Sequence, residues 1–197
     1  MNQATLGFRV KSGWTMAVLL SGSASAPKVV DRRRVELADP AVPESTQPFH
    51  AGLNLPKAAA TKIVGRLVRC VERFSERAIA ELIEKHRTGG HRIVGAGIVV
   101  GSTVDPATIK NDHIRAHAEE GRLFRVAIEN ALKASRLRSA IIPEKELFAK
   151  ATEALGIPEH RLKGELTAMG RAVEGSWRSE EKAAALAAWM ALAMRSR

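Results

Sequence analysis

The stretch Trp14-Thr-Met-Ala-Val-Leu-Leu-Ser-Gly-Ser-Ala-Ser-Ala-Pro-Lys-Val-Val30 has two interpretations that lead to different folds. As a secretory signal, its apolar run follows Arg9 and Lys11 and ends at the cleavage-like tripeptide Ala24-Ser25-Ala26. As part of a sheet, it is a β-strand, a turn of small residues and the start of the next strand. The choice decides whether residues 1–26 belong to the folded domain.

The strand interpretation accounts for more of the neighbouring sequence. Thr5–Val10 alternates with a period of two, and a short turn containing Gly13 follows it. The apolar run at Trp14–Leu20 is short for a signal core, and Pro27 is a poor residue just after a cleavage point. We therefore predict three antiparallel strands, at Thr5–Val10, Trp14–Leu20 and Lys28–Leu37, with a turn over Ser21–Pro27. Without a signal, we expect a cytoplasmic protein.

Beyond this meander, helices alternate with strands. A proline-rich loop over residues 39–56 leads into one long helix, Lys57–Arg87. The glycine-bounded apolar run His91–Gly101 is typical of a central strand that is buried on both faces. The remaining predicted elements are a helix over 107–135, a strand at Ser139–Ile142, and C-terminal helices over 144–197, at Glu144–Leu155, 159–173 and Ser179–Arg195. The order β-β-β-α-β-α-β-α predicts an α/β fold in a single domain over residues 1–197, with a mixed five-stranded sheet and helices on both faces.

Composition narrows the functional classes. The chain has 31 Lys and Arg against 21 Asp and Glu, a net charge of +10, and no block of sequence carries the excess. A positive charge spread over the whole chain creates an electrostatic field that favours polyanionic partners, and nucleic acid is the partner we expect. One cysteine, Cys70, excludes an internal disulfide. No apolar run is long enough for a transmembrane helix, so we expect no membrane partner.

The order of elements resembles the ribonuclease H-like superfamily, and within it the RuvC-like branch of Holliday-junction resolvases. Leu6-Gly7-Phe8-Arg9-Val10 is similar to that family's first strand, and Gly13-Trp14-Thr15-Met16-Ala17-Val18 is similar to its second strand. Glu181-Lys182-Ala183-Ala184-Ala185-Leu186-Ala187 is similar to the family's last helix. The resemblance implies a ribonuclease H-like mixed sheet and, in the family's nucleases, several carboxylates that hold two divalent metal ions about 4 Å apart.

The metal-binding carboxylates that this resemblance implies are largely missing. Arg9 stands where the family's first strand has an aspartate, and Ala184 replaces one of the paired acids of the last helix, where Glu181 remains. Asp105, after the central strand, is a further candidate acid. We therefore do not expect canonical nuclease activity, and whether the chain is an enzyme at all is left open. A buried pair between Arg9 and Asp105 is our hypothesis for what replaces the metal.

The densest polar cluster lies at the start of the helix predicted over 107–135. His113, His117 and Glu120 fall at i, i+4 and i+7, on a row that continues into Phe124 and Ile128. Such a group serves as acid and base, or holds a metal ion. The alternative is a set of capping and interface groups. A divalent metal is not the favoured interpretation, and we expect no cofactor.

A second feature is a row of arginines on the long helix. Arg66, Arg69, Arg73 and Arg77 lie on the face opposite the apolar stripe and are the candidate nucleic-acid-binding residues. The alternative is a solvated face whose arginines pair with Glu72, Glu76 and Glu84.

Three functional hypotheses follow. The first is a ribonuclease H-like domain without standard two-metal nuclease activity, which binds nucleic acid or a nucleic-acid-associated partner through its basic surface. The second is a hydrolase-like enzyme of unassigned class that uses the His/Glu pocket at the carboxyl ends of the strands. The third is an interaction protein, a homodimer formed through a sheet edge or through the last helix, whose apolar residues Leu186, Trp189, Met190 and Leu192 look more numerous than one core needs.

Overall fold

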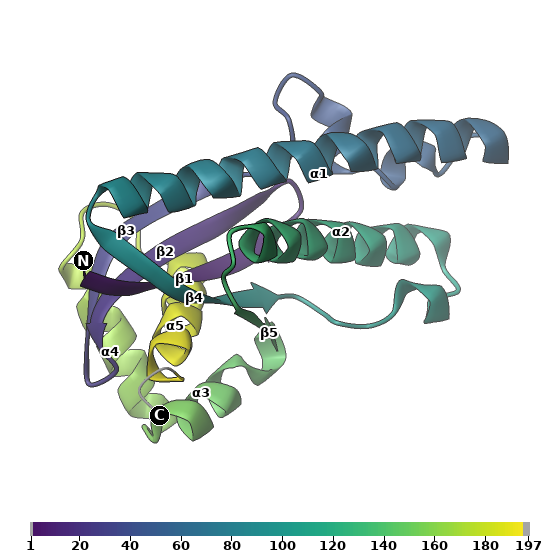
Figure 1. Ribbon diagram of the computed structural model, residues 1–197. Coiled ribbons are helices and arrows are strands. Elements are labelled where there is room, and N and C mark those ends of the chain that lie inside the picture. The colour runs from purple at the N-terminus through teal and green to yellow at the C-terminus, as the bar shows by residue number, and fades with distance from the viewer. Residues whose placement is uncertain (1, 195–197) are drawn as a thin grey trace.

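The computed structural model describes residues 2–194, which form one mixed sheet with helices on both of its faces (Figure 1). The strands are β1 (Asn2–Lys11), β2 (Trp14–Ser23), β3 (Ala26–Glu36), β4 (His91–Val100) and β5 (Ser139–Pro143). The helices are α1 (Lys57–Thr88), α2 (Asp112–Ala134), α3 (Leu147–Leu155), α4 (Glu159–Arg171) and α5 (Ser179–Ala193). The strand interpretation of Trp14–Val30 is confirmed.

The sheet has the strand order β3-β2-β1-β4-β5, with β1 at its centre. The first three strands pair antiparallel, and β1 pairs parallel with β4, which pairs parallel with β5. The mixed five-stranded sheet predicted from the element order is confirmed. The meander strands are longer than predicted, and the turn expected over Ser21–Pro27 shrinks to two residues, Ala24 and Ser25. Gly22, which has a φ of +95°, lets β2 continue to Ser23 where another residue would be strained.

The two faces of the sheet are covered by different helices. One apolar cluster joins Leu6 and Phe8 of β1 to residues of α1 and α2, such as Val71 and Phe124. The other joins β2 and β4 to α5, with α3 and α4 packed outside it. Contact between α5 and the sheet is close because glycines lie beneath it. A Cβ on Gly7 would stand 1.8 Å from the carbonyl oxygen of Ala184, so only glycine fits there.

The last helix is buried inside the molecule. Leu186, Trp189, Met190 and Leu192 are all at most 5% exposed, so the expectation of a surplus apolar stripe on this helix is wrong. The reason is that the sheet covers one side of α5 while α3 and α4 cover the other. Trp189 also donates a hydrogen bond from Nε1 to the Ala24 carbonyl in the β2–β3 turn, over 2.7 Å. Association through a sheet edge, at β3 or β5, is thus the remaining part of the self-association hypothesis and stays a prediction.

The segment that follows β4 differs from the helix expected over 107–135. Residues 101–111 form a loop with one 3-10 turn, η3 (Pro106–Thr108), and α2 begins only at Asp112. The cause is local: the Asn111 side chain accepts a hydrogen bond from the Ile114 amide and caps the helix. The proline-rich loop before α1 contains two short 3-10 turns, η1 (Pro43–Thr46) and η2 (His50–Gly52). Between residues 2 and 194, no helix has the length and apolar character that crossing a membrane would require.

Candidate functional site at the carboxyl ends of the strands

A cleft opens where the parallel strands β1 and β4 end. Its volume is about 510 Å³, and its walls come from the last residues of both strands, the loop after β4 and the first half of α2. Open sheets of this type place ligands at such a point, because helices on the two sides diverge there. Its polar lining includes Arg9, Lys11, Ser12, Ser102 and His117. No carboxylate is among the described residues that line it.

Arg9 lies on the face of β1 that α5 covers. Thr5, two residues before Gly7 on the same face, donates its hydroxyl to the Ala188 carbonyl of α5 over 2.7 Å. Arg9 continues this row beyond Gly7 and is only 5% exposed. Its Nη1 donates to the Val10 carbonyl over 2.7 Å. The guanidinium is therefore buried and does not reach into open solvent.

The counterion of Arg9 is Glu144, the first residue of the 3-10 turn η4 (Glu144–Glu146). Arg9 donates from Nε to one carboxylate oxygen over 3.2 Å and from Nη2 to the other over 2.5 Å. Arg9 does pair with a carboxylate, but the predicted partner, Asp105, is wrong, and the replacement of a metal by this pair stays a hypothesis. Asp105 instead accepts the Ala107 amide and caps η3. The loop after β4 places Asp105 away from Arg9. Strand β5 pairs in register with β4 up to Pro143, so Glu144, the next residue, lies near Arg9 at the ends of the strands.

The acids at the start of α5 are already committed to local partners. Glu181 is buried and accepts the backbone N–H of Arg178 over 2.9 Å, which caps the helix, and it lies 3.5 Å from Arg32. Glu180 lies 3.4 Å from Lys11. A hydrogen bond from Ser179, aided by its own backbone amide and by Lys11, holds the pKa of Glu180 below its ordinary value. Glu181 is therefore placed as a capping residue.

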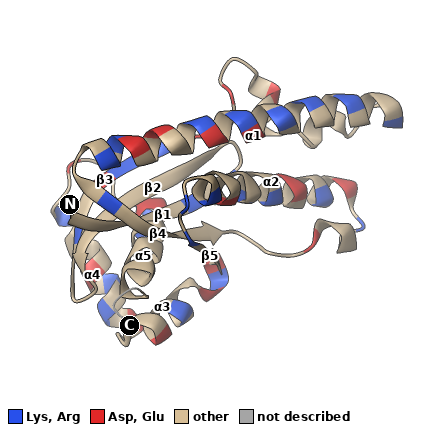
Figure 2. Cartoon of the chain, in the orientation of Figure 1, with Lys and Arg blue, Asp and Glu red and all other residues tan. Residues whose placement is uncertain are grey.

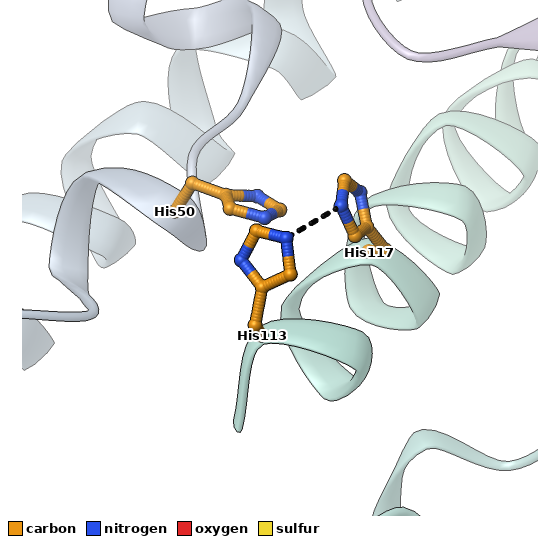
Figure 3. A group of neighbouring side chains, drawn as sticks. All are labelled: His50, His113 and His117. Atoms are coloured by element: carbon orange, nitrogen blue, oxygen red, sulfur yellow. Dashed lines mark hydrogen bonds between the residues drawn. The ribbon is translucent and has the colours of Figure 1, made fainter. Parts of the chain in front are cut away.

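The three residues predicted from the sequence, His113, His117 and Glu120, lie close together in the structure. A fourth residue that the sequence analysis missed, His50, joins them. His50, from η2 in the proline-rich loop, packs its ring against both other histidines: its centroid lies 4.8 Å from that of His113, in an edge-to-face contact, and 4.3 Å from that of His117, with the rings tilted (Figure 3). His113 and His117 lie 3.2 Å apart between their Nε2 atoms. Glu120 is fully buried behind the rings, and its Oε1 lies 2.7 Å from His50 Nδ1.

The cluster touches the strand-end cleft through a shared wall. His117 lines the cleft on one side and belongs to the histidine group on the other. The only signal for His50 in the sequence is an isolated histidine inside a long irregular loop, where binding residues are often found. The hypothesis of an enzyme that uses this pocket stays a prediction.

The arginine row of α1 is exposed along the helix (Figure 2). Arg77 lies 3.8 Å from Glu81 and over the ring of Phe74. Arg66, Arg69 and Arg73 have no carboxylate within 4.0 Å among the described residues, and none of the expected partners Glu72, Glu76 and Glu84 is within that distance of the row. Most of the row is therefore an uncompensated basic surface.

The class of fold is ribonuclease H-like: a meander of three strands, two further parallel strands and a last helix that packs on the central strand. Among solved structures, the chain is similar to Thermus thermophilus RuvC, with a TM-score of 0.53 and 12% identity over 95% of this chain and 92% of that one. It is equally similar to T. thermophilus RuvC in complex with a Holliday junction substrate, with a TM-score of 0.53 and 11% identity over 95% and 91%. This likeness is one of fold. No protein-family model and no curated protein sequence matches the chain.

Proposed function

We propose that this protein binds nucleic acid through its basic surface and is not a carboxylate-dependent two-metal nuclease. The observation that carries the proposal is the lining of the cleft at the strand ends, which includes Arg9 and Lys11 and no carboxylate among the described residues. A two-metal site needs several acidic ligands to neutralise two divalent cations. Buried Arg9 already holds its one nearby acid, Glu144, in a bidentate pair. Lys11 lies 3.4 Å from Glu180, so both cations are already paired, and the described residues that line the cleft leave no acidic ligand for a metal ion.

The binding surface in this proposal is the first half of α1. From Ser45 to Val71 the chain contains no acidic residue, while Lys57, Lys62, Arg66 and Arg69 lie within the same stretch. Figure 2 shows this half of α1 banded by basic residues alone, and Figure 1 shows it extending past the ends of the strands. Exposed cations without counterions gain most from phosphates, because they have no ion pair to give up.

The first ligand to test is branched DNA, because one of the similar structures is a RuvC complex with a Holliday junction. We would measure fluorescence anisotropy of a labelled four-way junction, and of a duplex of the same sequence, between 50 and 200 mM salt. If at least three arginines contact phosphates, affinity falls by roughly 40-fold or more over this range, from a slope of about 0.9 per contact.

The decisive variant replaces Arg66, Arg69 and Arg73 with glutamine. We expect it to bind more weakly and to lower the salt slope by about 3. The matched control replaces Lys145, Arg161 and Arg171, which are also exposed but lie on η4 and α4. Binding that does not depend on salt, or an equal loss in both triple variants, would rule out this surface.

The nuclease half of the proposal needs its own assay. Incubation of the junction with Mg²⁺ or Mn²⁺ should leave it intact at protein concentrations that saturate binding. Cleavage that requires a divalent metal, persists after further purification and disappears in a variant of the cleft, such as Lys11→Ala, would overturn it.

A further inference from the structure

The histidine cluster contains polar atoms that the protein itself does not satisfy. His50 Nε2 is buried and has no hydrogen-bond partner among the described residues. The same holds for Glu120 Oε2, on a side chain that is fully buried. A buried group left unpaired costs on the order of 1–3 kcal/mol, so two in one place indicate an absent partner. Figure 3 shows the rings of His50, His113 and His117 gathered close together.

The spacing of the nitrogens fits a metal ion. Each histidine offers one ligand nitrogen, and these atoms lie within 4.8 Å of one another. The two Nε2 atoms of His113 and His117 are 3.2 Å apart. Ligands on Zn²⁺ at 2.0–2.1 Å in a tetrahedron are separated by about 3.3 Å. The nitrogens that lie up to 4.8 Å apart would have to approach one another, and His113 and His117 are the two exposed side chains of the group.

Glu120 provides the second layer that histidine ligands require. Its Oε1 lies 2.7 Å from His50 Nδ1, which leaves the Nε2 atom of His50 as that ring's metal-binding nitrogen. Its Oε2 lies 3.9 Å from His117 Nδ1, so the same carboxylate stands behind two of the three rings. A carboxylate in this position fixes the tautomer and the orientation of a ligating imidazole. Such an arrangement is hard to explain as capping alone.

We propose that His50, His113 and His117 form a binding site for one Zn²⁺-class divalent cation, with Glu120 as the positioning residue. Three neutral imidazoles suit Zn²⁺, and they do not suit Mg²⁺, which prefers oxygen ligands. No fourth protein ligand is present among the described residues, so the proposal leaves the fourth position to water or another external ligand. The metal ties the proline-rich loop to the start of α2. The site does not depend on nucleic-acid binding.

The test uses full-length protein whose affinity tag has been removed, after chelation and exchange into metal-free buffer. Titration calorimetry with Zn²⁺ should give one site per chain, and Mg²⁺ should give no heat of binding. Co²⁺ should produce the visible absorption bands of a four-coordinate complex. A Zn²⁺ concentration a hundredfold above Kd should raise the melting temperature by roughly 5–10 °C.

Single variants assign the site. His50→Ala, His113→Ala and His117→Ala should each lose the one-to-one binding and the cobalt bands, and Glu120→Gln should weaken affinity by roughly 10–100-fold. His160→Ala, an exposed histidine on α4, is the matched control and should keep both. Circular dichroism of the metal-free variants identifies any that fail to fold, and the variants of the exposed His113 and His117 should fold. No binding by the parent protein, or binding unchanged in the folded His113→Ala and His117→Ala variants, overturns the proposal.

Discussion

Replacing Glu144 with alanine removes the counterion of a buried arginine and tests whether that pair holds the strand ends together. Arg9 is 6% exposed in its side chain, and Glu144 is 49% exposed. Breaking a fully buried pair costs about 3–5 kcal/mol, and an exposed pair contributes about 0–1 kcal/mol. With one partner buried and the other half-exposed, we expect a loss of about 2 kcal/mol. For a chain of this length, that lowers the melting temperature by roughly 4–8 °C.

A double-mutant cycle separates the pair from its surroundings. Arg9→Met removes the charge while keeping an apolar side chain of similar length, so it should cost less than about 1 kcal/mol. Combined with Arg9→Met, Glu144→Ala should add almost nothing, because no unpaired cation is left. The coupling energy, measured by urea unfolding at low salt, should therefore be about 2 kcal/mol.

Glu153→Ala is the control, because Glu153 is an exposed glutamate on α3 with no cation within 4.0 Å among the described residues. It should change the free energy of unfolding by less than about 0.5 kcal/mol. Our reasoning fails if Glu144→Ala costs no more than this control. It also fails if the effects of the two substitutions at Arg9 and Glu144 simply add.

Three further predictions follow from the packing. Gly7→Ala should destabilise the fold by at least about 3 kcal/mol, since the new Cβ would clash with the α5 backbone. Gly164→Ala, whose Cβ would have no atom within 4 Å, should stabilise α4 by up to about 1 kcal/mol. If urea unfolding shows that both substitutions change the free energy of unfolding in the same direction, this prediction is contradicted. Burial holds the pKa of His86 below 6.5 despite the opposing charge of Asp31. Because the unfolded chain then binds the proton more readily, the free energy of unfolding should fall as the pH drops below 6.5, and less steeply in His86→Gln; parallel curves would exclude His86 as the cause. Trp189→Phe removes the hydrogen bond to the β2–β3 turn and should cost about 1–2 kcal/mol by circular-dichroism melting, and an unchanged melting temperature would show that this bond contributes nothing.

The candidate site was only partly predictable from sequence. The row of His113, His117 and Glu120 could be found because helix geometry relates residues three and four apart. His50 could not, because its place depends on the path of a long irregular loop that carries no periodic signal. The same holds for the partner of Arg9. Asp105 and Glu144 both follow a strand, and only the direction of each connecting segment shows that Glu144 reaches the guanidinium.

The sequence by itself determined the elements and their order, because the signals for strands, helices and turns come from residues close together in the chain. The alternation at Leu6, Phe8 and Val10 and the small turn residues of the opening stretch were enough to predict a meander and, from it, a mixed sheet. The tertiary structure alone decided which distant side chains meet. In the tertiary structure, the apolar residues of α5 are buried between the sheet and the helices α3 and α4, and Arg9 pairs with Glu144. His50 lies beside α2, which carries His113 and His117. These contacts depend on how whole elements pack, and local sequence does not encode that.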